Sequence, residues 1–292
     1  MATAKPEGSP TALRILLGAQ LRQLREAKGL TRSVACYTIR ASESKMSRLE
    51  LGRVGFKERD IRDLLVLYGV EDPDQRDGLL ALAKQANQPG WWHRYTDILP
   101  SWFQSYVGLE ETAMLIRTYE GHLIPGLLQT EDYARAVMTA GLPGTSDGEV
   151  ERWLRLRMDR QQLVSRPDAP RLWAVVDEAA LRRPVGGPEV MCTQLDRLIA
   201  ATKLPNVTLQ VVQFRAGAHA ALGLPFVILR FADPDLPDMV YLEQLTSGLW
   251  IDKRDEVDSY AQVMDRLVVQ AEDPSDTEEI LRRVRTDMKR KA

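Results

Sequence analysis

The spacing of apolar residues predicts a run of helices over the first third of the chain. In the first predicted helix, from Leu13 to Lys28, leucines recur at intervals of three and four residues and line one side: Leu17, Leu21 and Leu24. Gly29 suits the end of this helix, because glycine readily adopts the left-handed conformation of a C-terminal cap. Thr31 suits the start of a second helix as its N-cap. Two more amphipathic helices are expected over 60–68 and 73–87.

A short and unusually polar segment, residues 42–50, precedes the helix expected at 60–68. On a helix that Ser42 caps, Met46 and Leu49 fall on one side, so this side can be anchored in a core. The other side carries small, polar and charged residues, namely Glu43, Ser44, Ser47 and Arg48, with Lys45 at its flank. A helix that enters the major groove of DNA needs this arrangement, because small residues permit close approach, and hydroxyl and basic groups bind phosphates.

The second part of the chain combines helices with strands. Pro89 and Gly90 interrupt the helical pattern, and the next predicted helices cover 106–119, 131–139 and 149–164. After Pro170, short runs rich in β-branched and aromatic residues predict strands over 172–176, 207–214, 225–231, 239–243 and 249–252. Three further helices are expected over 189–201, 256–270 and 277–290.

These elements predict a multidomain protein. The helix around Ala35, a short turn and the helix from Ser42 form a helix-turn-helix. The fold class is therefore an all-α helix-turn-helix N-terminal domain followed by an α+β domain with a small mixed sheet. The expected divisions are a flexible leader at 1–11, the helix-turn-helix domain at 12–88, an aromatic connector at 89–105 and the α+β domain at 106–292. A length of 292 residues, with 44% hydrophobic and 27% charged residues, suits an ordinary globular protein of two domains.

Charge is distributed unevenly along the chain. Residues 1–60 contain twelve Lys and Arg but six Asp and Glu, an excess of six positive charges. Since the formal net charge of the whole chain is −2, residues 61–292 carry an excess of eight negative charges. A basic first domain on an acidic body indicates that the first domain meets a polyanion.

The sequence offers no sign of a disulfide framework, a membrane span or a cofactor. Cys36 and Cys192 are far apart and form no CxxC pair, so we expect no metal site. The first ten residues lack the apolar core of a signal peptide, and no apolar run is long enough to cross a bilayer. We therefore expect a cytoplasmic protein with no membrane contact and no cofactor.

The first domain resembles the Xre class of helix-turn-helix regulators, to which Cro and phage repressors belong. The residues that carry the resemblance are Leu-Arg-x-x-Arg-x-x-x-Gly-Leu-Thr-Arg at 21–32 and Ser-x-Met-Ser-Arg-Leu-Glu-x-Gly at 44–52. The resemblance implies a structural pair of Arg25 with Glu50 and a phosphate contact from Arg32. Arg40 departs from the pattern, since that family often has glycine at this place in the turn.

A transcription regulator of this class is expected to bind a double-stranded DNA operator as a homodimer. The expected DNA-binding residues are Arg32, Ser42, Glu43, Ser44, Lys45, Ser47, Arg48 and Arg53. Arg48 is expected to read guanine in bidentate fashion. Glu43 would repel phosphate, so it should accept a hydrogen bond from a cytosine amino group or pair with Lys45 or Arg48.

The rest of the chain resembles the large C-terminal domain of a family of regulators that is abundant in actinobacteria and was long labelled only as a domain of unknown function. The matching segments are Gly-Trp-Trp-His-Arg-Tyr at 90–95, Tyr-Glu-x-x-Leu-Ile-Pro-Gly-Leu-Leu-Gln-Thr-Glu-Asp-Tyr-Ala-Arg-Ala at 119–136, Asp-Glu-Ala-Ala-Leu-Arg-Arg-Pro-Val-Gly-Gly at 177–187, Asn-Val-Thr-Leu-Gln-Val at 206–211 and Gly-Ala-His-Ala-Ala at 217–221. The resemblance implies an antitoxin-like regulator that is controlled by a small protein encoded nearby.

The residues themselves leave the role of the second domain open. It could bind a protein partner, sense a small molecule as effector, or be an enzyme, although no nucleophile, metal or phosphate motif is present and we expect no catalytic residues. The candidate residues for an effector or partner pocket are Trp92, His93, Glu178, Arg182 and His219. The first two hypotheses differ in whether this domain encloses an apolar pocket with a few convergent polar groups.

Overall fold

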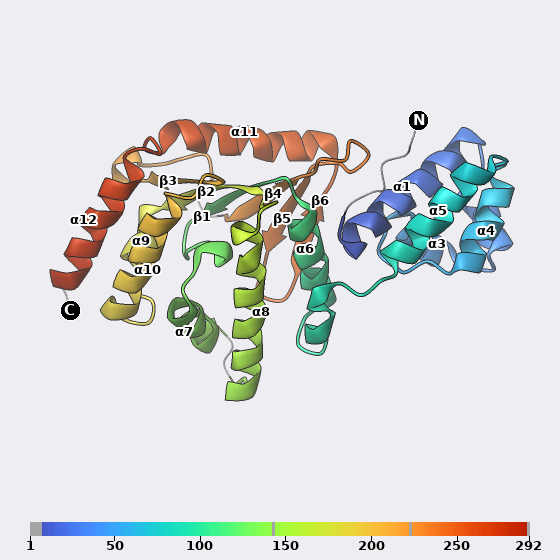
Figure 1. Cartoon of the computed structure of the whole chain (residues 1–292). Helices are drawn as coiled ribbons and strands as arrows, with labels where there is room; N and C mark the ends of the chain where they lie inside the picture. Colours follow the sequence, from blue (N-terminus) through green and yellow to red (C-terminus); the bar gives the residue numbers. More distant parts are fainter. Residues whose placement is uncertain (1–7, 142–143, 222–223, 291–292) are drawn as a thin grey trace. The chain divides into compact units, whose positions relative to one another are not determined.

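The computed structural model describes residues 8–141, 144–221 and 224–290 (Figure 1). Most of the expected leader, residues 1–7, lies outside the described residues. The chain divides into two compact units. The first contains the chain up to Arg94 together with Gln104–Thr112 and Asp233–Leu236, and the second contains Tyr95–Phe103, Ala113–Ala232 and the chain from Pro237 onward.

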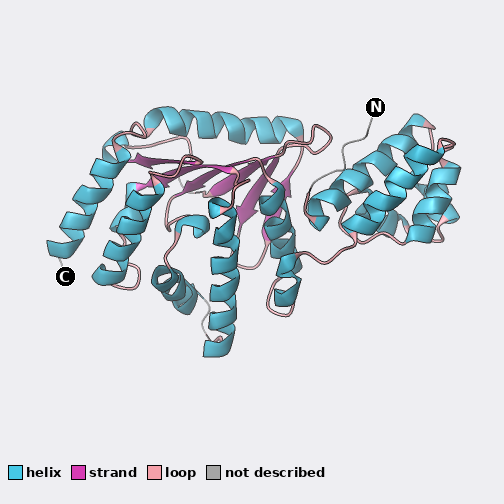
Figure 2. Cartoon of the chain, in the orientation of Figure 1, coloured by secondary structure: helices cyan, strands magenta, loops and turns pink. Residues whose placement is uncertain are grey.

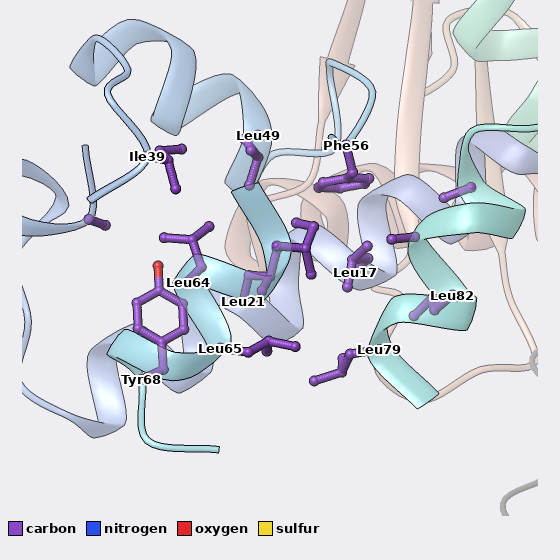
Figure 3. Close-up of a cluster of buried hydrophobic side chains, with 14 of the residues drawn as sticks. Leu17, Leu21, Ile39, Leu49, Phe56, Leu64, Leu65, Tyr68, Leu79 and Leu82 are labelled. Atoms are coloured by element: carbon purple, nitrogen blue, oxygen red, sulfur yellow. The ribbon is translucent and has the colours of Figure 1, made fainter. Parts of the chain in front are cut away.

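The N-terminal part of the first unit is built on five helices. They are α1 (Pro10–Ala27), α2 (Arg32–Thr38), α3 (Glu43–Glu50), α4 (Glu58–Leu67) and α5 (Pro73–Ala86). Leucines of four of these helices and Phe56 meet in one apolar core, which also contains Tyr68 (Figure 3). The predicted order of helices is confirmed. Helix α1 begins earlier than predicted, because Ser9 caps it and Pro10 suits the first helical position, so residues 10 and 11 belong to the helix and not to a leader.

The turns of the first unit follow the predicted capping pattern. Gly29 ends α1 with a φ of 66°, in the left-handed region, and the Thr31 hydroxyl accepts a hydrogen bond from the Val34 N–H at the start of α2. Arg40, in the turn between α2 and α3, has a φ of 51°. The arginine therefore adopts the left-handed geometry for which glycine is better suited, at a cost of about 1–2 kcal/mol.

Two glycines let α1 and α3 approach closely. A Cβ atom on Gly18 of α1 would lie 2.6 Å from the carbonyl oxygen of Glu50, and one on Gly52 would lie 2.5 Å from the backbone nitrogen of Ile15. Gly52 also has a φ of 66°. No side chain fits at either place without a backbone shift, so the glycines fix the distance between the first helix and the end of α3.

The second unit contains a six-stranded mixed sheet, which confirms the predicted α+β class. The strands are β1 (Leu115–Glu120), β2 (Arg171–Asp177), β3 (Val207–Val212), β4 (Phe226–Arg230), β5 (Met239–Glu243) and β6 (Gly248–Ile251). Their order across the sheet is β3-β2-β1-β4-β5-β6. The first three strands are parallel, and the pairs β1–β4, β4–β5 and β5–β6 are antiparallel.

Helices cover both faces of this sheet (Figures 1 and 2). The helices of this part of the chain are α7 (Glu131–Gly141), α8 (Asp147–Ser165), α9 (Glu178–Arg182), α10 (Pro188–Ala201), α11 (Arg254–Gln270) and α12 (Thr277–Arg290). Helix α11 runs along one face and packs on β3, β4 and β5, whereas α8 and α10 lie on the other face. Helices also connect the parallel strands, so helix and strand alternate between β1 and β3.

The prediction of one helix over 106–119 is wrong. Helix α6 (Ser101–Thr112) begins and ends earlier, and β1 follows it, so the predicted domain boundary at 106 falls inside a helix. In β1, Ile116 and Tyr119 are buried; the whole strand pairs with β2 in parallel, and its residues from Leu115 to Tyr119 pair with β4 in antiparallel. This pairing satisfies the backbone and favours a strand over a continued helix, and it depends on partners more than 50 residues away.

Buried glutamines hold the segment from Ile124 to Thr130, one of the segments that carry the family resemblance. The Gln129 amide donates to the Ile124 carbonyl at 2.7 Å. The Gln194 amide on α10 donates to the Leu128 carbonyl at 2.9 Å, and its oxygen accepts from the Thr130 N–H at 2.6 Å. These bonds satisfy backbone groups of a buried loop, so this motif has a structural role.

Candidate nucleic-acid interface

Helix α3 has the two-sided character that the sequence predicted. The Ser42 hydroxyl accepts a hydrogen bond from the Lys45 N–H at 3.2 Å, which confirms Ser42 as the N-cap. Met46 and Leu49 are buried in the core of the first unit. The rest of the helix presents polar side chains to the surface: Glu43, Ser44 and Arg48 are exposed, and Lys45 and Ser47 are partly exposed.

A buried carboxylate fastens both ends of the helix-turn-helix to α1. Glu50, the last residue of α3, accepts from Arg25 Nε at 2.5 Å and from Arg32 Nε at 2.9 Å. The structure therefore contains the implied pair of Arg25 with Glu50. Arg25 is itself buried, and its hydrogen bond to Glu50 raises the pKa of the guanidinium, which stays charged. It also donates to the Leu30 carbonyl at 2.8 Å.

Arg32 lies at the first turn of α2, where the resemblance placed a phosphate contact. Its side chain remains 43% exposed although Nε is bonded to Glu50. Because a guanidinium has five N–H donors in a rigid fork, the bond to Glu50 leaves other donors available and fixes their direction. Arg32 is therefore positioned by the same carboxylate that holds α1 to α3.

Lys45 has a protein partner that the sequence did not indicate. Its ammonium group donates to Asp60 at 3.0 Å, and the Asp60 side chain, at the start of α4, is only 3% exposed. A buried carboxylate of this kind needs a cation, so it restrains Lys45. The expected role of Lys45 in DNA contact is thus shared with a bond that ties α3 to α4. The pair joins residues 15 positions apart in different helices, so no local sequence pattern predicts it.

The remaining side chains of the expected interface are accessible. Arg48 Nε donates to the Ser44 carbonyl of its own helix at 3.3 Å, and Arg53 lies exposed after the helix. Tyr37 on α2 is 88% exposed and was not among the expected contacts, because an isolated tyrosine gives no signal in the sequence. The arrangement can present hydroxyls, guanidinium groups and one carboxylate, Glu43, to the edge of a DNA groove.

The five residues expected to line an effector or partner pocket belong to different places. Trp92 and His93 are part of the first unit. Glu178 and Arg182 form an ion pair at 2.6 Å and line a hollow of about 270 Å³, which His219 does not line. Arg215 and Arg283 also border this small hollow, so its lining is largely polar.

His219 is buried among polar partners rather than exposed in a pocket. Its Nε2 lies 3.2 Å from the Tyr119 hydroxyl and 3.4 Å from the Asp177 carboxylate. Burial, with the negative charge of Asp177 adding, raises the pKa of Tyr119 to about 12, so this hydroxyl stays protonated at neutral pH. The contacts join strand ends of the sheet to the loop before β4.

Among the residues that the structure describes, no helix is long and apolar enough to cross a membrane. Within the same residues, no group of three or more His, Cys, Asp and Glu side chains is placed to hold a metal ion.

Two families match this chain. Residues 16–79 match the family described as Helix-turn-helix domain, and residues 103–283 match the family described as Domain of unknown function (DUF5753). The first match confirms the predicted helix-turn-helix, and the second extends over more than half of the chain. The comparisons with curated proteins and with solved structures gave no match.

Proposed function

Since this chain belongs to the DUF5753 family and begins with a helix-turn-helix domain, we propose that it is a sequence-specific DNA-binding transcription regulator. One observation carries the proposal. Helix α3 is anchored by buried Met46 and Leu49 and by the Glu50 carboxylate, while its other side is polar, small and accessible. A helix held in this way can enter a major groove without unfolding its own core.

The charge of the first sixty residues supports the same proposal. Their excess of six positive charges favours association with a polyanion and should make binding fall steeply with salt. In this proposal Arg32 and Arg53 contact phosphates, and Arg48 reads a base. The regulator is of the Xre class and binds a roughly twofold-symmetric operator as a homodimer. A single short helix makes few contacts with DNA, so a second subunit on a half-site one helical turn away is needed to supply more.

A gel shift against the promoter upstream of the chain's own gene tests this proposal. The full-length protein should retard that DNA at about 50 mM salt and release it as salt rises, with a log–log slope that counts the phosphates it neutralises. Arg53→Ala should reduce the slope by about one, and Glu26→Gln on α1 serves as a control outside the interface. Absence of any sequence-dependent retardation would count decisively against the proposal.

For the second unit we propose a binding role without catalysis, in which a small protein encoded nearby docks and changes DNA binding, as in antitoxin-like regulators. The acidic excess of residues 61–292 supports a partner with a basic surface. Calorimetry of the full chain with the product of the neighbouring small reading frame should give heat at micromolar concentration. If no heat develops and the operator affinity is the same with and without that product, the partner proposal is wrong.

A further inference from the structure

Glu43 is an acid in a place where DNA would repel it. It is the first residue of α3, and its side chain is exposed. In a helix-turn-helix, the N-terminal residues of the second helix contact base edges. A carboxylate in this position lies close to two rows of phosphates, so it lowers affinity for every sequence that offers no hydrogen-bond donor.

Neither of the two cations of α3, Lys45 and Arg48, pairs with Glu43 in the structure. The Lys45 ammonium group donates to buried Asp60 at 3.0 Å. Arg48 Nε donates to the Ser44 carbonyl at 3.3 Å. Within residues 8–141, 144–221 and 224–290, the Glu43 side chain makes no hydrogen bond or ion pair with another residue. Its acceptor oxygens thus face the solvent that DNA would replace.

On the basis of the proposed function, we propose that Glu43 is a specificity-determining residue that accepts a hydrogen bond from the N4 amino group of an operator cytosine. Cytosine presents this donor in the major groove. Adenine presents its N6 amino group beside the acceptor N7, so a carboxylate meets repulsion there, whereas a Gln amide bonds both atoms. Guanine and thymine present acceptors, which a carboxylate repels.

If Glu43 only stabilised its own helix, the effects of its substitution would be different. An acid in the first turn stabilises a helix through its dipole, by about 0.3–1 kcal/mol, and needs no DNA to do so. Glu58 provides the control, because it is likewise the exposed first residue of a helix, α4, although its carboxylate pairs with Arg62 at 2.6 Å. If Glu43 acts only on its helix, then Glu43→Gln and Glu58→Gln should have the same consequences for base choice, namely none.

The test is selection of binding sites from random double-stranded DNA by the full-length protein and its Glu43→Gln and Glu58→Gln variants. Affinities are then measured on the selected site with each base at every position. The unmodified protein should prefer cytosine at one position of each half-site by about 5- to 140-fold. Glu43→Gln should change this preference to adenine, and Glu58→Gln should retain cytosine.

The outcomes separate the inference from the proposed function. If the unmodified protein enriches no motif, the proposed function fails. If it enriches a motif and Glu43→Gln enriches the same one, the function stands and the role of Glu43 is overturned. Glu43→Ala is a second variant, needed in case Glu43→Gln prevents DNA binding. It should lose the preference for cytosine without gaining one for adenine. A retained preference for cytosine would also overturn the inference.

Discussion

The two units use buried polar groups for different purposes. In the first unit, the buried carboxylates of Glu50 and Asp60 hold cations that lie beside or on the helix proposed to face DNA. In the second unit, buried Gln129, Gln194 and Thr277 bond backbone groups of loops and strands. In these examples, a buried charge of the first unit positions surface cations, whereas a buried amide or hydroxyl of the second unit satisfies backbone groups.

We expect some variants to change both DNA binding and stability, and others to change stability alone. A variant that releases a cation of the first unit should alter both properties, because the same bonds hold the core and the interface. A variant that removes a buried amide of the second unit should lower stability and leave the intrinsic DNA affinity of the folded protein unchanged. Trp91 and Trp92 belong to the first unit and the other four tryptophans to the second, so tryptophan fluorescence alone does not separate the two units.

The largest effect is expected for Glu50→Ala. It leaves the buried guanidinium of Arg25 without its carboxylate, which should cost about 3–5 kcal/mol in the unfolding free energy of the first unit. Hydrogen exchange measured by mass spectrometry should show lost protection in α1 to α3 while β1 to β3 keep theirs. Gln194→Ala is the control in the other unit and should produce the reverse pattern. Equal loss in both units would break the comparison.

Glu120 at the end of β1 sharpens the comparison, because it is a carboxyl group placed near another acid. Burial, with the charge of Glu243 adding, raises the pKa of Glu120 from 4.5 to about 8. Ionisation of Glu120 therefore destabilises the fold. The stability that its protonated form contributes is fully present below about pH 4.5 and is lost as pH rises through about 8.

Glu120→Gln should remove this pH dependence. The variant should unfold at a higher temperature than the unmodified protein, and the difference in unfolding free energy should grow by about 1.4 kcal/mol for each pH unit between about pH 5 and about pH 8. Tryptophan fluorescence during heating measures it, since Trp173 on β2 lies in the same unit. A difference that stays constant over this range would contradict the raised pKa.

Lys45 tests whether the buried Asp60 restrains a side chain of the interface. If the bond to Asp60 persists on DNA, Lys45→Met should lower the stability of the first unit by about 1–3 kcal/mol and leave the salt slope of DNA binding unchanged. Arg32→Met, in contrast, should reduce the slope by about one. A matching fall in slope for both variants would place Lys45 on a phosphate.

The smallest effect is expected for Arg40→Gly in the turn between α2 and α3. Glycine relieves the left-handed conformation at the cost of a more flexible unfolded chain, so the variant should be more stable by about 0.5–1 kcal/mol. Arg40→Ala keeps the strained backbone and should change stability little. Urea denaturation followed by circular dichroism distinguishes the two variants. Greater stability in both would assign the effect to the lost side chain.

The local features of this protein follow from neighbouring residues in the sequence. A few neighbouring residues are enough to predict the helical spacing of leucines, the N-caps Ser42 and Thr31, and the C-terminal Gly29. Each of these features has the predicted geometry. The polar face of α3 follows from the same spacing, because a helix places residues by their order alone. The pair of Arg25 with Glu50 came from a family resemblance, since 25 residues separate its members.

Tertiary structure alone decided the features that depend on distant partners. The segment from Leu115 to Glu120 is a strand because β2 and β4 flank it, although its residues also suited the end of a helix. Asp60 binds Lys45 because α4 packs beside α3, and this contact decides which charges of α3 remain for DNA. The physical reason is that strand pairing and buried ion pairs are formed between elements, so their energy depends on positions that no short stretch of sequence contains.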